Sequence, residues 1–138
     1  MKEKVDRYLK KGASYKRLLA EYKKHNTLVI GFDFNSTVHD YYKVGESYEM
    51  VRGLLRDLKS INCKCICWTT YKDPEYVIKF CKENNIPCDG VNCEGVPLPW
   101  KSRKPFFNIL LDDRAGLLQT YNDLTKLVKH ITNNEGKN

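Results

Sequence analysis

Three apolar runs of strand length, separated by stretches with helical periodicity, constrain the fold of this chain most strongly. The run TLVIGFDF at 27–34 is nearly continuous in apolar and β-branched residues, and CKCICWTT at 63–70 and FFNILLDD at 106–113 are similar. Continuous hydrophobicity is typical of strands that are buried on both faces of a parallel sheet. Strands that alternate with helices therefore predict an α/β fold, a three-layer, doubly wound parallel sheet.

The segments between the strands carry the signals of helices and loops. Asp73 and Pro74 pair an N-cap residue with a proline at the first helical position, which is a typical helix start. Elsewhere, apolar residues recur at helical spacing. The expected elements are helices at 47–60, 73–85 and 117–131, a short strand at 88–92 and a proline-rich loop at 93–105.

The N-terminal segment is strongly basic. Residues 1–24 carry nine basic and three acidic side chains, and an intermittent apolar stripe predicts a helix at 2–24 that Gly12 bends or breaks. This face is a candidate for binding a polyanion or a second subunit. The expected organisation is a basic helical extension at 1–26, an α/β domain at 27–132 and a frayed tail at 133–138.

Composition narrows the class of protein. The chain has 24 basic and 17 acidic residues, a net charge of +7, which favours an anionic partner or a solubilising surface in equal measure. No apolar run approaches the ~18 residues of a spanning helix, and no secretory signal precedes the domain, so we expect a cytoplasmic protein without membrane contact. The six cysteines lack the paired spacing of a structural zinc site, so reduced core thiols are expected.

Polar side chains follow three of the predicted strands, at the point where each strand ends. They occur as DFNST at 33–37, TT at 69–70 and DD at 112–113. In doubly wound sheets the carboxyl ends of the strands form the binding crevice. Several carboxylates there supply the hard oxygen ligands that suit Mg²⁺. Threonine hydroxyls, with Arg103 and Lys104 as cations, complete a set of groups that can bind phosphate.

In these motifs the sequence resembles the haloacid dehalogenase-like (HAD) superfamily of phosphohydrolases. The matching segments are DFNST at 33–37 for its DxDxT motif, ICWTT at 66–70 with Thr69 as the better match, Lys104, and LLDD at 110–113. The LLDDR stretch is also similar to nucleotidase and polynucleotide-phosphatase branches. The resemblance spans 28–113 and implies a HAD-like Rossmannoid fold. The intervals are filled by the expected helices, so it is similar to members with a minimal cap or none.

The resemblance also implies roles for individual residues. Asp33 would be the nucleophile and a magnesium ligand, and the backbone carbonyl of Asn35 a second ligand. The remaining implied roles are phosphate binding by Thr69 and Lys104, and completion of the metal shell by Asp113, alone or with Asp112.

Asn35 departs from the family pattern. Phosphatases of the superfamily carry an aspartate at this position, which protonates the leaving oxygen and then activates water. An amide does neither near neutral pH, and general acid–base catalysis contributes roughly 10²–10⁴-fold. The groups that bind phosphate and metal are nevertheless retained, so the sequence favours binding over turnover. His39 or Asp40 is an alternative acid, although a histidine in a loop is more often simply solvated.

Aromatic residues on the predicted loops around the site point to a nucleotide-like ligand, because bases stack on such rings. Taken singly, each of these aromatic residues is better explained by covering an edge of the core, and it is the group beside the basic residues that favours a nucleotide-like ligand. The residues expected to contact the ligand are Asn35, Ser36, Thr37, Tyr41, Thr69, Thr70, Tyr71, Trp100, Arg103 and Lys104.

Three functions are consistent with these observations. The first is a protein that binds, and sequesters, a small nucleotide-derived phosphate ligand with Mg²⁺. The second is an active magnesium-dependent phosphohydrolase, favoured by the retained Asp33. The third, less favoured, is a nucleic-acid-binding module that uses the basic N-terminal helix, with steep salt dependence. That helix packs either on its own domain or on another chain, which leaves a homo-oligomer open.

Overall fold

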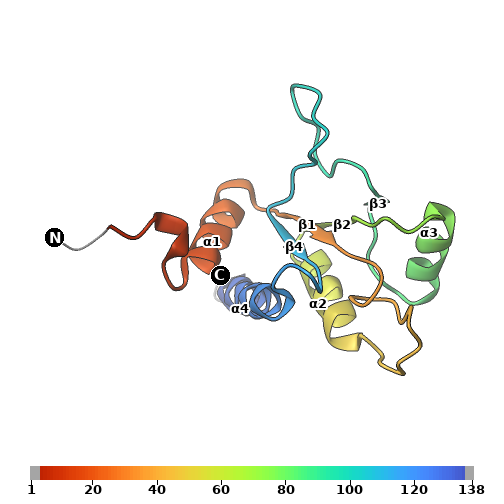
Figure 1. Cartoon of the computed structure of the whole chain (residues 1–138). Helices are drawn as coiled ribbons and strands as arrows, with labels where there is room; N and C mark the ends of the chain where they lie inside the picture. Colours follow the sequence, from red (N-terminus) through yellow and green to blue (C-terminus); the bar gives the residue numbers. More distant parts are fainter. Residues whose placement is uncertain (1–3, 136–138) are drawn as a thin grey trace.

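The structure, a computed structural model that describes residues 4–135, is built around a four-stranded sheet in which all strands are parallel. The strands are β1 (Val29–Phe32), β2 (Lys64–Cys67), β3 (Gly90–Val91) and β4 (Ile109–Leu111). Their order is β3-β2-β1-β4, so the direction in which strands are added reverses at β1. The predicted α/β fold with a parallel sheet is confirmed (Figure 1).

Each strand is shorter than the apolar run that predicted it. Leu28 and Phe34, on either side of β1, are fully buried although they lie outside the strand. The strand expected at 88–92 is reduced to Gly90 and Val91. An apolar run therefore marks burial and extends further along the chain than the strand itself.

Four α-helices accompany the sheet within residues 4–135. They are α1 (Ala13–His25), α2 (Glu49–Ser60), α3 (Pro74–Glu83) and α4 (Leu117–Glu135). The predicted start of α3 is confirmed, because the Asp73 side chain accepts a hydrogen bond from the backbone N–H of Tyr76 at 3.1 Å. None of these helices is both long and apolar enough to cross a membrane. α4 continues past its predicted end at 131 as far as Glu135; of the tail expected at 133–138, positions 136–138 lie outside the described residues.

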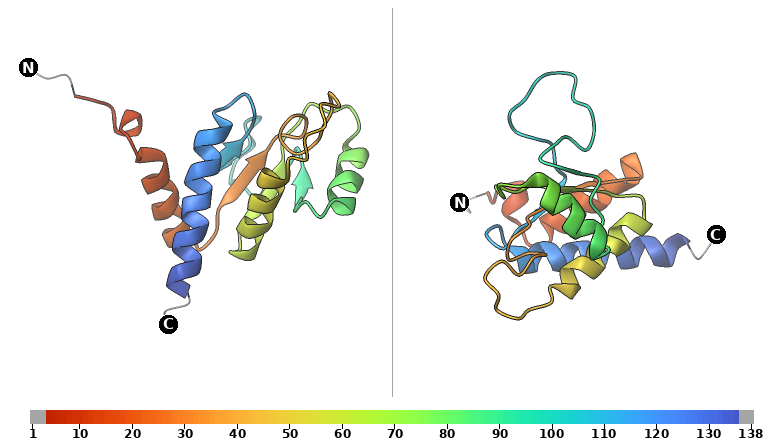
Figure 2. Two further views of the ribbon diagram at one scale, coloured as in Figure 1. Left: turned by 90° about the horizontal axis from the view of Figure 1, so that it is seen from below. Right: turned by 90° about the vertical axis from the view of Figure 1, so that its right-hand side faces the viewer.

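The two faces of the sheet are covered differently. α2 and α4 lie against one face, whereas the segment between β3 and β4 crosses the other (Figures 1 and 2). Gly95 in that segment lies so close to the sheet that a Cβ atom there would be 2.6 Å from the Val29 side chain. The helix-side core is formed by Ile30, Phe32, Cys65, Cys67 and Leu111 of the sheet with Leu55, Leu58, Leu124 and Leu127 of the helices.

The N-terminal segment, predicted as a helix at 2–24 that Gly12 bends or breaks, is divided into two helical pieces. A short 3₁₀ helix, η1 (Arg7–Leu9), is followed by a turn and then by α1. Gly12 caps α1 with φ = 79°, a left-handed conformation that interrupts helical propagation, so the break expected at this glycine is confirmed. α1 packs on α4 of its own domain and buries Leu18. Residues 1–3 lie outside the described part of the chain.

Four cysteine thiols belong to the core. Cys63, Cys65 and Cys67 alternate along and beside β2, and with Cys81 of α3 they are buried. Burial raises the pKa of the Cys63 thiol to about 11, so this group stays protonated at neutral pH. The side chains therefore act as small apolar groups in packing.

Candidate functional site

The carboxyl ends of β1 and β4 bring three carboxylates together. Asp33 directly follows β1, and its backbone N–H donates to the carbonyl of Leu111 at the end of β4, at 2.8 Å. Asp112 and Asp113 directly follow β4. A carboxylate oxygen of each aspartate lies within 4.8 Å of those of the other two. We call Asp33, Asp112 and Asp113 the acidic cluster; it joins the first and last of the sequence motifs.

Burial, together with the neighbouring carboxylates, changes the acidity of Asp33. Burial is the main cause that raises its pKa, from 3.8 to about 7, followed by a hydrogen bond with Asp113 and the negative charge of Asp112. A backbone hydrogen bond at Phe34 opposes the shift. The protein by itself therefore does not stabilise the full negative charge of this cluster at neutral pH.

The acidic cluster fits a hard divalent cation. No lysine or arginine within residues 4–135 forms an ion pair with Asp33, Asp112 or Asp113, so no described side chain neutralises their charge in this way. Carboxylate oxygens are the ligands that Mg²⁺ prefers, and one or two of them, with water and phosphate oxygens, complete its usual shell. The donor set and its uncompensated charge agree with the magnesium site expected from the sequence.

Thr37 fixes the position of Asp113. The Thr37 side chain is fully buried, and its hydroxyl donates to Asp113 Oδ1 at 3.1 Å while it accepts from the backbone N–H of Asp113 at 3.2 Å. This pair of hydrogen bonds joins the loop after β1 to the loop after β4. In this arrangement Thr37 orients a carboxylate of the acidic cluster, whereas the sequence placed it against the ligand.

Asn35 is held by His39, a candidate alternative acid in the sequence. Nδ1 of His39 lies 2.9 Å from Oδ1 of Asn35, and because an amide oxygen only accepts, Nδ1 is the donor. The backbone N–H of Ser36 also donates to the carbonyl of His39 at 2.9 Å, and Ser36 takes a left-handed φ of 64°. The loop after β1 thus folds back on itself and fixes the amide group of Asn35.

Aromatic rings surround His39. Its imidazole stacks on Phe34 with ring centroids 4.4 Å apart. Burial and the positive charge of the nearby Arg52 guanidinium both lower the pKa of His39. Tyr41 and Tyr71, both predicted to lie at the rim of the site, meet edge to face at 6.5 Å. The other rings in contact with this group are Tyr76 and Phe80 of α3, with Tyr42 against Tyr41. The position of α3 beside this group could not be predicted from the sequence, because its aromatic residues fit equally well in a core.

Thr69 and Thr70 lie just beyond the end of β2. The backbone of Thr69 is fixed by the side chain of Asn92, which accepts from its N–H and donates to its carbonyl, each at 2.8 Å. The Thr69 hydroxyl accepts from the backbone N–H of Tyr71 at 3.1 Å, while Thr70 is exposed. Both threonines therefore follow the strand next to β1, at the same edge of the sheet as the acidic cluster.

Trp100, Arg103 and Lys104 are not brought into contact with the acidic cluster. All three are exposed, Trp100 to 66%, on the segment that extends away from the sheet in Figure 1. Among residues 4–135 the side chain of Lys104 has no ion-pair partner. Prolines prevent regular structure in this segment, so the sequence offers no periodicity from which the direction of these side chains can be inferred.

A cavity of about 470 Å³ adjoins the loop after β1. Ser36 and Thr37 line it on one side, and the segment that leads into α2 lines it on the other, with Glu46, Tyr48 and Met50. Its acidic side chains make it unsuited to hold a phosphate without a cation. This cavity could not be predicted from the sequence, because it is formed by a turn with a left-handed residue, Tyr48, at φ = 57°.

Comparisons with known proteins support the fold and leave the family open. No protein-family model matches the chain, and no curated protein matches it. The chain is similar in structure to a conserved protein coded by a locus from Bacteroides thetaiotaomicron, with a TM-score of 0.59 and 21% sequence identity. The match covers 73% of this chain and 92% of the other. At this level of identity the likeness establishes a shared α/β fold with a parallel sheet.

Proposed function

We propose that this chain is a HAD-like protein that binds a small, nucleotide-derived phosphate ligand with Mg²⁺ and turns it over weakly or not at all. The observation that carries the proposal is the acidic cluster at the ends of β1 and β4. Asp33 and Asp113, with Asp112 and the backbone carbonyl of Asn35, would hold the ion. When bound, Mg²⁺ would neutralise the cluster and attract the phosphate oxygens.

Asn35 supports binding over turnover. Its amide oxygen is already occupied by the His39 N–H, so the group that it can offer to a ligand is its NH₂. An amide NH₂ donates a hydrogen bond to a phosphate or leaving oxygen but transfers no proton to it. The site therefore retains recognition without the acid–base step.

The aromatic group supports a nucleotide as the ligand. Tyr41 is exposed to 51% and Tyr71 is half-buried, and both belong to loops at the carboxyl ends of the strands. A base stacked on such a ring gains roughly 1–3 kcal/mol. Phosphate held at the acidic cluster and a base held on a tyrosine would together select a nucleotide over inorganic phosphate.

An active phosphohydrolase is the second candidate, and the retained Asp33 favours it. In that case Asp33 would attack phosphorus, the leaving oxygen would depart with the proton supplied by water, and a second water would release phosphate from Asp33. Such an enzyme would require a good leaving group, because Asn35 supplies no acid.

The test is to incubate the purified protein with Mg²⁺ and a panel of linear and cyclic nucleotides, then to identify the bound compounds after denaturation. The proposal expects intact ligand in proportion to protein, and none when EDTA is present. Dephosphorylated product in many-fold excess over protein would establish the enzyme instead.

Two variants make this test specific to the acidic cluster. Asp113→Asn removes one metal ligand and should abolish magnesium-dependent capture. Asp57 is an exposed carboxylate on α2. Asp57→Asn removes the same charge far from the acidic motifs in the sequence and should leave capture unchanged. If both variants bind as the parent protein does, the acidic cluster is not the site.

A further inference from the structure

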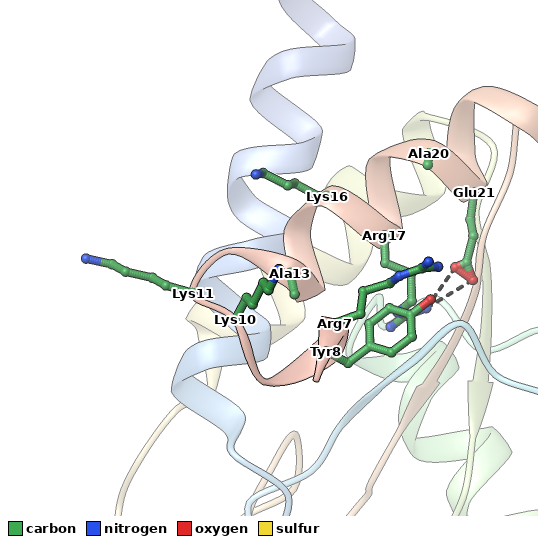
Figure 3. A pocket seen from close by; sticks show the side chains of 9 residues that line it. All are labelled: Arg7, Tyr8, Lys10, Lys11, Ala13, Lys16, Arg17, Ala20 and Glu21. Atoms are coloured by element: carbon green, nitrogen blue, oxygen red, sulfur yellow. Dashed lines mark hydrogen bonds and ion pairs between the residues drawn. The ribbon is translucent and has the colours of Figure 1, made fainter. Parts of the chain in front are cut away.

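A second charged feature lies outside the acidic cluster, between η1 and α1. There the chain encloses a groove of about 560 Å³ (Figure 3). This volume is within the range of ~300–1,000 Å³ that is usual for small-ligand sites. The groove is lined by residues of η1, the turn at Gly12 and one side of α1. The left-handed Gly12 allows η1 to lie beside α1 instead of extending it.

The positive charge of this groove is largely uncompensated. Its lining includes five basic side chains and one acidic side chain, Glu21. Glu21 is already bound by Arg17, at 2.8 and 3.0 Å, and by the amide of Asn108 at 3.2 Å. Within residues 4–135 the four other cations have no ion-pair partner; they are Arg7, Lys10, Lys11 and Lys16. A groove with this charge attracts a ligand that carries several negative charges.

One aromatic ring lies among these cations. Tyr8 is exposed to 63% and lines the groove, and Figure 3 shows its ring beside the side chains of Arg7 and Arg17. Exposure of a large ring leaves one of its faces free for stacking. Cations that follow a backbone together with an aromatic platform are the usual elements of single-strand recognition.

We propose that the groove between η1 and α1 binds single-stranded nucleic acid, with phosphates at Arg7, Lys10, Lys11 and Lys16 and a base on Tyr8. A duplex fits less well, because its bases are stacked internally and unavailable to Tyr8. An anionic membrane fits less well, because the cations line a hollow, whereas a flat bilayer contacts a protruding surface. This proposal is independent of the magnesium site, and each can fail without the other.

The first test measures fluorescence anisotropy of a labelled 12-nucleotide single-stranded DNA and RNA in EDTA, so that the proposed magnesium site contributes nothing. Four phosphate contacts predict that log K falls with log salt concentration with a slope of about −3. Lys10→Gln/Lys11→Gln should reduce this slope to about −1.4 and weaken binding about 25-fold at ~0.1 M salt. Lys79 and Lys82 are two exposed lysines on α3. The double variant Lys79→Gln/Lys82→Gln is the matched control and should bind almost as the parent protein does.

The second test concerns the ring. Tyr8→Leu should weaken binding about fivefold or more at any salt concentration, because it removes stacking without removing charge. Tyr8→Phe should retain binding, since it keeps the ring. Neither variant alters the core, because Tyr8 is exposed.

Three outcomes would overturn the proposal. No single-strand binding at low salt would exclude it directly. An equal loss in the two double-lysine variants would mean that net charge alone attracts the oligonucleotide. Tighter binding to a duplex of the same sequence, or to phosphatidylserine vesicles, would assign the groove to a different partner.

Discussion

At the scale of single residues, the pair Asn35 and His39 determines which chemistry the site can perform. The imidazole is fixed by stacking on Phe34, and it fixes in turn the orientation of the amide. Among the described residues no acceptor takes a hydrogen bond from the Asn35 NH₂, so this group remains available for a ligand. A donor at this point stabilises an anionic oxygen by a charge-assisted hydrogen bond but does not protonate it.

Replacement of this amide by a carboxylate tests that interpretation. Asn35→Asp places an ionisable group beside the His39 N–H and restores an acid–base residue. We expect magnesium-dependent hydrolysis of nucleoside monophosphates to rise by roughly 10²–10⁴-fold, measured as phosphate released under multiple turnover. The double variant Asp33→Asn/Asn35→Asp should lose this gain. Flat turnover in Asn35→Asp would mean that the pocket differs from a phosphatase by more than this residue.

At the scale of elements, β1 is the centre of the sheet and is packed closely on both faces. Gly31 pairs with Ile66 on β2 and with Leu110 on β4. A Cβ atom at Gly31 would lie 2.6 Å from Leu110 Cδ2 and 3.0 Å from the Phe107 ring. The glycine therefore allows Phe107 and Leu110 to cover the sheet on the face opposite α2 and α4.

A pair of glycine substitutions tests this packing. Gly31→Ala should lower the free energy of unfolding by about 1–3 kcal/mol, because the side chains of Leu110 and Phe107 must move. Gly53→Ala, within α2, meets no atom within 4 Å and should raise it by about 0.5–1 kcal/mol through helix propensity. Chemical denaturation measures both. A neutral Gly31→Ala would show that this face of the sheet is loosely packed.

The elements also explain what the sequence could predict. Asp33 and Asp112 could be assigned to strand ends because the buried runs before them are nearly continuous, and Asp73 could be assigned to a cap because Pro74 follows it. The contact of His39 with Asn35 depends on how the loop after β1 folds back on itself. No periodic pattern in the sequence indicates the path of such a loop. The environment of Lys104 depends on a segment with no regular structure, so its predicted role rests on the family resemblance alone.

At the scale of the whole molecule, the two proposed sites have opposite charge. The acidic cluster follows the central strands, and the basic groove lies at the N-terminal end, beyond α4 (Figures 1 and 3). Although the net charge of the chain is +7, negative charge is locally in excess at the carboxyl ends of β1 and β4. This excess affects the stability of the whole fold, because the cluster is assembled only in the folded state.

The pH dependence of stability follows from the raised pKa of Asp33. Its folded value, about 7, exceeds the ordinary value of 3.8, so the folded state binds the proton more tightly than the unfolded state does. In EDTA we expect the stability contributed by this group to fall as pH rises from 4 to 7 and then to level off. Asp33→Asn should be more stable than the parent protein at pH 8 by roughly 1–2 kcal/mol, after allowance for solvent screening.

Thermal unfolding at several pH values measures this effect. Asp57→Asn is the control, because it removes a carboxylate without relieving the cluster. Mg²⁺ should stabilise the parent protein at pH 8 more than Asp33→Asn, since the ion binds the folded state preferentially. Equal stabilisation of the two proteins by Mg²⁺ would show that the ion binds elsewhere.

The position of β1 between β2 and β4 has a consequence for the order of folding. β1 and β2 can pair early, but Asp33 meets Asp112 and Asp113 only after β4, from the last part of the chain, has closed a long loop onto β1. Such distant pairing is slow, because chain entropy is lost before the contacts form. The proposed affinity for a divalent ion should therefore arise with the slowest refolding phase, and a nascent chain that ends before β4 would lack the proposed ion site.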